Sequence, residues 1–189
     1  MEADIRAAKA ENDVVFVAQH WGIHFVRAQI ADYETDVARA AIAAGADAVI
    51  GGHPHVIKGC QVIDGKPVFH SLCNFATDLG MDEAHAKSKS WNEIRVLAER
   101  WEPDFEGPYN FPDESRLAMV ARFVIAGGKV QRAGFLPLHI GRDAIPRFVT
   151  PDQPEHAAVL AYLREVTAEA GLNANYIEGD DMIAIEASA

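Results

Sequence analysis

Short apolar runs flank a helical pattern in the first third of the chain. Residues 14–18 and 48–50 are apolar throughout, which is typical of strands buried on both faces. Between them, residues 28–44 repeat apolar side chains at helical spacing, and Gly45 follows as a helix stop. The order strand, helix, strand predicts a parallel βαβ unit.

The same patterns predict the remaining elements. A glycine-containing turn separates two apolar runs at Asp64-Gly65 and again at Gly127-Gly128, so each predicts a hairpin. Residues 4–11 and 153–170 have helical patterns, and residues 182–185 predict a short final strand.

A chain of 189 residues with 49% hydrophobic residues is long enough for one domain with a real core. We expect residues 1–80 to hold the βαβ unit and the first hairpin. Residues 81–115 contain few regular patterns and many prolines and acids, which favours a loop or lid. Residues 116–189 hold the second hairpin and a closing helix. The apolar pattern of residues 91–101 fits a helix or a strand equally well.

Charge and composition exclude several classes of partner. The formal net charge of −11 disfavours binding to nucleic acid or to an anionic membrane. No apolar run is as long as a membrane span, and the first residues lack the apolar core of a signal peptide, so a cytoplasmic location is the default expectation. Cys60 and Cys73 are too few for a disulfide scaffold.

The candidate chemistry lies in Gly51-Gly52-His53-Pro54-His55. The glycines allow a sharp turn and a close approach to the backbone, and Pro54 favours an extended conformation for His53. In an extended chain, His53 and His55 would point the same way. Alone, this stretch fits a polar turn with two surface histidines. In a βαβ unit, however, His20 ends the first strand at the same sheet edge, so the three histidines predict a metal centre.

Three segments together resemble a known family. They are Gln19-His20-Trp21-Gly22, residues 45–56 with the Gly-Gly-His-Pro-His motif, and residues 65–75 with Ser-Leu-Cys-Asn-Phe. These segments resemble the CapA-type poly-gamma-glutamate capsule proteins, which are calcineurin-like metallophosphoesterases. The resemblance runs from about Asp13 to Phe75 and continues weakly to about Leu172. It implies an α/β class fold, a four-layered α/β/β/α sandwich, incomplete at its N-terminus.

The resemblance also implies a two-metal hydrolase that acts on an anionic small molecule or polymer. His20 and His53 would bind one divalent ion and His55 the other, and His20 would also count among the catalytic residues. Neutral imidazoles suit manganese, iron or zinc. Two such ions clamp a phosphoryl group and generate a bridging hydroxide. Capsule polymer synthesis is the biological setting that the family name implies.

Other residues near this edge have alternative interpretations. His24 stands where the family usually has an acid, and is either an acid/base group or a surface residue. Cys73 stands where the family tends to have glycine, and either packs as a small hydrophobe or reaches the metal. Asn74 either orients a ligand or belongs to a plain turn. Trp21 is expected beside the site, whereas His70, inside a strand, is expected to be a satisfied core histidine.

The superfamily's bridging aspartate and its Asn-His pair have no counterpart in the chain. We therefore expect a C-terminal portion of the domain, completed by an upstream segment or a partner chain, with at most one weakly held metal in this chain alone. A free sheet edge predicts self-association. The alternative to an enzyme is a non-catalytic remnant that acts as a binding or assembly module.

Overall fold

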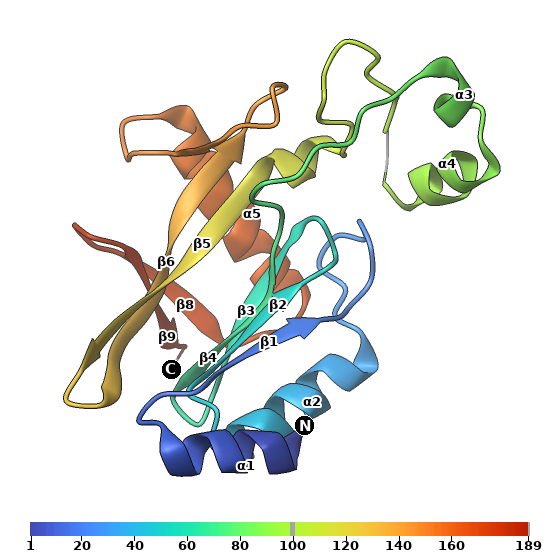
Figure 1. Ribbon diagram of the computed structural model, residues 1–189. Helices are drawn as coiled ribbons and strands as arrows, with labels where there is room; N and C mark the ends of the chain where they lie inside the picture. The colour runs from blue at the N-terminus through green and yellow to red at the C-terminus, as the bar shows by residue number, and fades with distance from the viewer. Residues whose placement is uncertain (99–100, 189) are drawn as a thin grey trace.

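The computed structural model describes residues 1–98 and 101–188 and shows a mixed α/β protein with two β-sheets (Figure 1). In the first sheet, of order β1-β2-β4-β3, β1, β2 and β4 are parallel and β3 is antiparallel to β4. Its strands are β1 (Phe16–His20), β2 (Ala48–Gly52), β3 (Ile57–Ile63) and β4 (Lys66–Leu72). Helix α2 (Asp32–Ala43) connects β1 to β2, so the predicted parallel βαβ unit is confirmed.

The first predicted hairpin is also confirmed. Strands β3 and β4 pair in register from Ile57 opposite Leu72 to Ile63 opposite Lys66. The turn residues Asp64 and Gly65 have φ angles of 48° and 72°. Two successive positive φ angles define the type I′ turn, whose twist matches that of the strands it joins.

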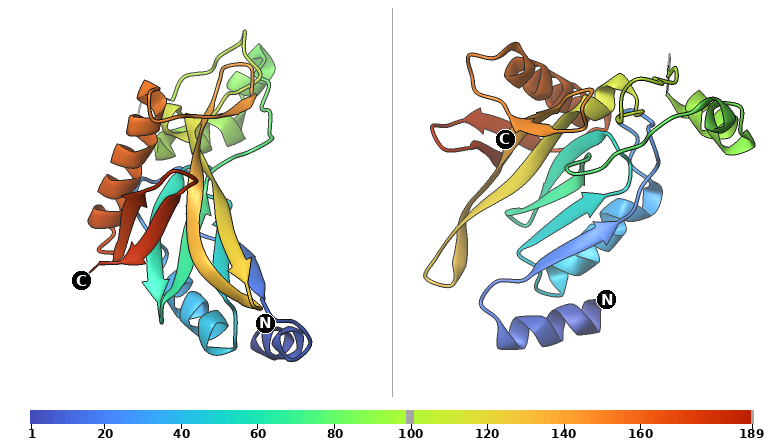
Figure 2. Two further views of the ribbon diagram at one scale, coloured as in Figure 1. Left: turned by 90° about the vertical axis from the view of Figure 1, so that its left-hand side faces the viewer. Right: turned by 45° about the horizontal axis from the view of Figure 1, so that its top comes forward.

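Alternate residues of the first sheet face two different cores. Val49 of β2 and Val68 of β4 pack with the apolar faces of α1 (Glu2–Glu11) and α2. Their neighbours Ile50 and Phe69 face the opposite way, towards the second sheet. Helix α2 therefore covers the outer face of the first sheet, α1 lies beside α2 near the amino end of β1, and the two sheets share the inner core (Figure 2).

The second sheet has the order β5-β6-β9-β8, with β7 paired to β6. Its strands are β5 (Leu117–Ala126), β6 (Lys129–Ile140), β7 (Pro146–Phe148), β8 (Ala174–Glu178) and β9 (Ile183–Ala187). The predicted hairpin at Gly127-Gly128 and the predicted C-terminal helix, α5 (Pro154–Glu169), are confirmed. Helix α5 packs against β3 and β6, and thereby links the two sheets.

The first strand differs from the prediction. Along β1 the residues alternate between exposed and half-buried, and Phe16 is 38% exposed, so the expectation of burial on both faces is wrong. The reason is its position at the edge of the first sheet. The ring of Phe16 stacks on Phe123 of β5, the edge strand of the second sheet, at 4.3 Å between centroids. Both sheets therefore end on the same side of the molecule.

Residues 81–115 contain short helices as well as loops. They are α3 (Glu83–Ala86), α4 (Lys89–Ile94) and two 3₁₀ turns, η1 (Arg95–Leu97) and η2 (Asp113–Arg116). The ambiguous pattern at 91–101 is helical up to residue 97, and residues 99–100 lie outside the described part. This segment packs on the first sheet's loops through a cluster of Trp91, Trp101, Phe25 and Val56.

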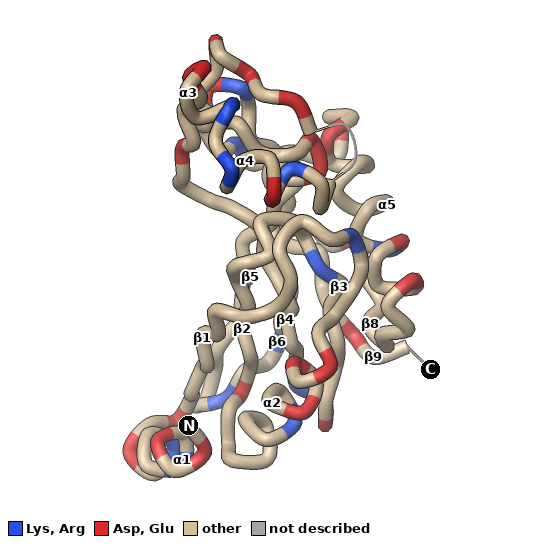
Figure 3. Tube along the Cα trace, turned by 90° about the vertical axis from the view of Figure 1, so that its right-hand side faces the viewer, with Lys and Arg blue, Asp and Glu red and all other residues tan. Residues whose placement is uncertain are grey.

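Most charged residues lie outside the strands of the first sheet (Figure 3). Strands β1 and β2 carry no Lys, Arg, Asp or Glu, and β3 and β4 carry one lysine each. Among the described residues, no helix has the length and apolar character needed to cross a membrane. The domain division at residues 80 and 115 stays a prediction.

Candidate metal centre

Four histidines gather at the carboxyl ends of β1 and β2. His20 ends β1, His24 lies in the loop that follows, and His53 and His55 lie in the turn after β2. Ring centroids are 3.8 Å apart for His24 and His53, 4.4 Å for His20 and His53, and 5.5 Å for His24 and His55. The parallel βαβ topology thus brings together residues that are distant in sequence. They meet at the carboxyl ends of the strands, where α/β sheets bind their ligands.

The turn that carries two of these histidines is not extended, contrary to the expectation from Pro54. His53 has a φ of 105° and His55 a φ of 57°. Such angles are costly for side chains other than glycine, and cluster at functional sites. The backbone N–H of Phe25 donates to the Pro54 carbonyl at 2.9 Å, so the loop with His24 is fastened to this turn. This loop brings His24 to His53 and His55, and strand alternation does not align His53 with His55.

The electrostatics of the cluster favour neutral imidazoles. Burial, followed by the neighbouring His53, His55 and His20, lowers the pKa of His24 to about 4. Burial and the same kind of repulsion also lower the pKa of His53. Neutral imidazole is the form that binds a metal ion, so these residues are in the binding form at pH 7.

The side chain of Asn74 lies against His55. Its Oδ1 is 2.6 Å from His55 Nδ1, and its Nδ2 donates to the hydroxyl of Tyr109 at 2.7 Å. Asn74 is buried, and lies two residues beyond the end of β4. This contact supports the interpretation of Asn74 as an orienting residue over that of a plain turn.

Cys73 contacts main-chain groups. Its thiol lies 3.1 Å from the His55 carbonyl oxygen and 3.3 Å from that of Ser115. Burial raises the pKa of the Cys73 thiol to about 12. A metal ligand must be a thiolate, so these surroundings favour packing over ligation.

Trp21 contacts the core histidine His70. Its indole N–H donates to the main-chain oxygen of His70 at 2.8 Å, and its ring stacks on the His70 ring at 5.7 Å. His70 is fully buried, and its Nδ1 lies 3.1 Å from Glu34 Oε2, so the prediction of a satisfied core histidine is confirmed. Glu34 in turn accepts from the N–H of Ala31 at the start of α2.

Aromatic residues form one wall of the centre. The rings of Phe25 and Phe111 stack on His55, with centroids 5.6 Å and 5.1 Å away. Sequence reasoning did not single out Phe25, Tyr109 or Phe111. The available signal was the aromatic content of the region predicted as a lid, which contains both Tyr109 and Phe111.

The histidine nitrogens are suitable ligands for a divalent transition metal, but they do not complete the coordination of one ion. Among the described residues, no group of three or more His, Cys, Asp or Glu side chains is arranged to hold one metal ion. In the assignment from the family resemblance, no ion takes more than two of these histidines. Each ion would therefore need further ligands.

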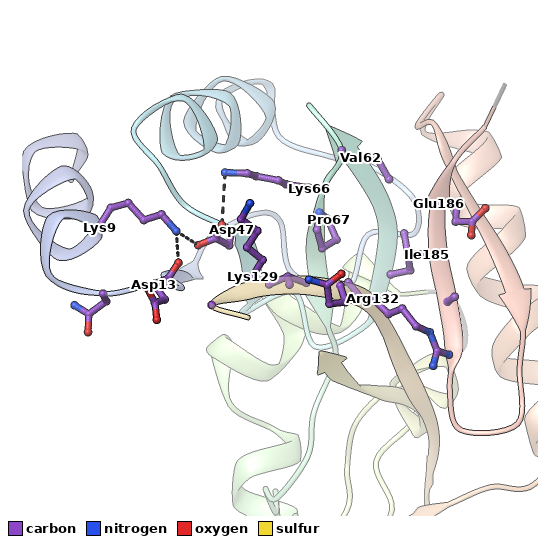
Figure 4. A pocket seen from close by; sticks show the side chains of 17 residues that line it. Lys9, Asp13, Asp47, Val62, Lys66, Pro67, Lys129, Arg132, Ile185 and Glu186 are labelled. Atoms are coloured by element: carbon purple, nitrogen blue, oxygen red, sulfur yellow. Dashed lines mark hydrogen bonds and ion pairs between the residues drawn. The ribbon is translucent and has the colours of Figure 1, made fainter. Parts of the chain in front are cut away.

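Two cavities lie near opposite ends of the parallel strands. One, of about 650 Å³, is lined by His20, Gly52, Asn74 and apolar residues of both sheets. The larger, of about 840 Å³, lies near the amino ends of β2 and β4 (Figure 4). There Lys9 and Lys66 pair with Asp47 at 2.7 Å and 3.8 Å. The larger cavity contains none of the predicted site residues.

The segment that holds the four histidines matches a known protein family. Residues 1–79 match the family described as bacterial capsule synthesis protein PGA_cap. This confirms, over that segment, the resemblance that the motifs indicate. All four histidines and Asn74 lie within it, whereas Tyr109 and Phe111 lie outside.

Two known capsule proteins match this chain over similar lengths. The PGA biosynthesis protein CapA of Bacillus subtilis (strain 168) is 41% identical over 76 residues, which is 40% of this chain and 20% of that protein. The capsule biosynthesis protein CapA of Bacillus anthracis is 38% identical over 72 residues, 38% of this chain and 17% of that protein. The chain thus matches about a fifth of these relatives' length.

Proposed function

We propose that this chain provides the histidine side of a divalent-metal centre in a metal-dependent hydrolase of the metallophosphoesterase type, active in capsule polymer synthesis. The observation that carries the proposal is the convergence of His20, His24, His53 and His55 at one sheet edge. The match to capsule synthesis proteins over residues 1–79 supports the biological setting. The two sheets are compatible with the α/β/β/α sandwich of the metallophosphoesterase superfamily. This fold assignment is part of the proposal.

The proposed roles follow from position and protonation. His20 and His53 would hold one ion and His55 the other, with carboxylates completing the coordination. Bound manganese, iron or zinc would supply Lewis acidity and lower the pKa of a coordinated water. His24 is neutral at pH 7, so it can accept a proton or serve as an additional nitrogen ligand.

The apolar cavity beside His20 is the proposed substrate site. Its lining includes Ile50, Leu72 and Met119, and no lysine or arginine is among the described residues that line it. An anionic substrate would therefore be held by the metal ions and by main-chain groups of the histidine turns. The wall of Phe25 and Phe111 would limit water access from the other side.

Metal analysis tests the proposal. The purified chain is equilibrated with manganese or zinc, and bound metal is counted alongside hydrolysis of a chromogenic phosphodiester. Because this chain supplies only the histidine side of the centre, about one weakly held equivalent that His53→Ala removes is the expected result, whereas two equivalents with turnover lost in His53→Ala would show a complete centre. If no metal binds, or if His53→Ala binds metal as the wild type does, the proposed centre is wrong.

A second candidate is a binding or assembly module without catalysis. The lack of any three-ligand group among the described residues favours it, as do the open edges of β1 and β5. In that case the chain would show no metal-dependent hydrolysis, with or without His53. Metal-dependent turnover that His53→Ala abolishes would reject this candidate.

A further inference from the structure

A chain of hydrogen bonds runs from the metal-centre histidine His55 to a residue outside the family match. It passes from His55 to Asn74, from Asn74 to Tyr109, and from Tyr109 to the carbonyl of Ser115. Tyr109 is 1% exposed and Asn74 is 7% exposed, so water does not compete for these groups. The direction of each bond can be deduced from the chemistry of its end.

The carbonyl oxygen of Ser115 only accepts hydrogen bonds. Tyr109 has a single hydroxyl proton, and donates it to this oxygen at 2.6 Å. The Tyr109 oxygen must then accept from Asn74, at 2.7 Å, and only the amide nitrogen of Asn74 can donate. This fixes the orientation of the Asn74 amide, with Oδ1 facing His55.

The last bond determines the state of the imidazole. Asn74 Oδ1 lies 2.6 Å from His55 Nδ1 and can only accept, so Nδ1 carries the proton. In a neutral ring, Nε2 is then the nitrogen with a free lone pair. Partners of this kind set the tautomer and ring orientation of metal-binding histidines, and their loss costs about 10–100-fold in metal affinity.

Tyr109 is itself held firmly in place. Its segment forms a parallel bridge with Leu79, and the N–H of Leu79 donates to the Pro108 carbonyl at 2.7 Å. The guanidinium of Arg116 lies over the Tyr109 ring at 5.3 Å, and Phe111 packs against the same ring at 4.8 Å. Residues 108–116 thus form a support behind the histidine turn.

We propose that Tyr109 is a positioning residue which, through Asn74, holds His55 in the tautomer that binds metal through Nε2. The inference rests on the proposed metal centre. It assigns a role at that centre to the part of the chain beyond residue 79, which the family match does not cover.

The test compares Tyr109→Phe with Tyr176→Phe in the full chain. Tyr176 is a matched control because it is buried and its hydroxyl also makes two hydrogen bonds, to the Cys60 N–H and to Thr167, neither of which is a histidine of the metal centre. The first readout is the ¹⁵N NMR signature of the His55 tautomer in metal-free protein. The second is zinc affinity by competition with a chelating dye.

Tyr109→Phe is expected to mix the two His55 tautomers and to weaken zinc binding about 10–100-fold. Tyr176→Phe should change neither readout, although both variants lower the melting temperature. Adding Asn74→Asp to Tyr109→Phe should restore both, since a carboxylate accepts from His55 without needing Tyr109 to orient it. A structural role for Tyr109 predicts no such rescue.

An unchanged tautomer and an unchanged zinc affinity in Tyr109→Phe would overturn the inference. If Tyr109→Phe does not fold, Asn74→Leu gives the same two readouts, and unchanged values there also overturn it. Failure of the wild-type chain to bind zinc would count against the proposed function, whereas the metal-free tautomer measurement would still decide the role of Tyr109.

Discussion

The indole N–H of Trp21 donates to the main-chain oxygen of His70 across the position of Gly51. A Cβ at residue 51 would overlap both of these groups and would lie 2.7 Å from the Phe69 carbonyl oxygen. At Gly52, the next residue, a Cβ would meet nothing within 4 Å. The two neighbouring glycines of the motif therefore have different reasons to be glycine.

Substitution of these two glycines should change the stability of the protein to very different extents. Gly51→Ala is expected to destabilise the protein by about 3 kcal/mol, because backbone of β4 and the Trp21 ring must both move. Gly52→Ala is expected to change stability by no more than about 0.5 kcal/mol. Urea denaturation followed by fluorescence measures both. Equal effects of the two substitutions would show that close approach is not what requires glycine at residue 51.

His24 should contribute to metal affinity. Its ring centroid lies 3.8 Å from that of His53, nearer than the ring of His20 at 4.4 Å, and His24 is neutral at pH 7. We expect His24→Gln to weaken zinc binding by roughly 10-fold. His85→Gln, at an exposed position of the four-residue helix α3, is the control and should bind zinc as the wild type does. Unchanged affinity in His24→Gln would assign His24 to the surface.

The two cysteines should respond differently to replacement by glycine. Cys73 has a φ of 69°, so glycine relieves backbone strain there, and Cys73→Gly should alter stability by less than about 1 kcal/mol. Cys60 is fully buried in β3, and Cys60→Gly should cost about 2 kcal/mol or more through lost packing.

Thiol chemistry checks the same pair of residues. Burial raises the pKa of each thiol to about 12, so neither should react with a disulfide reagent at pH 8 in the folded protein. Zinc affinity in Cys73→Gly should equal that of the wild type. A large loss of affinity would show that the thiol reaches the metal after all.

Lys58 should make stability depend on pH. Its ammonium is buried and donates to the carbonyls of Val26 and Gln29, and burial lowers its pKa from 10.5 to about 8. Between these values the unfolded chain binds more protons than the folded one, so the contribution of Lys58 to stability rises with pH, by at most about 1.4 kcal/mol per unit.

The variant Lys58→Met isolates this effect from other titrating groups. The stability of the wild type relative to Lys58→Met should increase from pH 8 to 10.5, as measured by denaturation at several pH values. Parallel stability curves for the two proteins would mean that Lys58 titrates normally in the folded state.

The open edge of the first sheet should promote self-association. Strand β1 has no charged residue, and Ala18 at its centre is exposed. Charged residues on edge strands prevent pairing between molecules. We expect the wild type to self-associate reversibly in sedimentation experiments, and Ala18→Lys to shift it to monomer. Ala161→Lys, on the exposed face of α5, is the control and should leave the association unchanged.

The sequence alone predicted the elements whose signals are local. The βαβ unit, both hairpins and helix α5 follow from apolar spacing and from glycine at turns, and the structure confirms them. The meeting of His20 with His53 also followed, because parallel topology fixes where strand ends lie.

Predictions failed where tertiary contacts override local preference. The preference that Pro54 imposes on His53 is outweighed by the hydrogen bond between Phe25 and Pro54, which holds the turn in a bent form. The exposure of β1 depends on which strand ends the sheet, and an apolar run does not reveal that. Tyr109 could not be connected to Asn74 in advance, because their contact spans 35 positions without any repeating pattern.

The matched segment shares its core with the second sheet and α5, which limits how far it can be separated from them. Phe69 and Ile57 from the matched segment pack in one cluster with Phe135 of β6 and Leu163 of α5. Expressed by itself, residues 1–79 would present this apolar face to water and lose the support behind His55. The boundary of the family match therefore lies inside one folding unit, and a transplant of the histidine motif into another scaffold would need the second sheet and α5 to come with it.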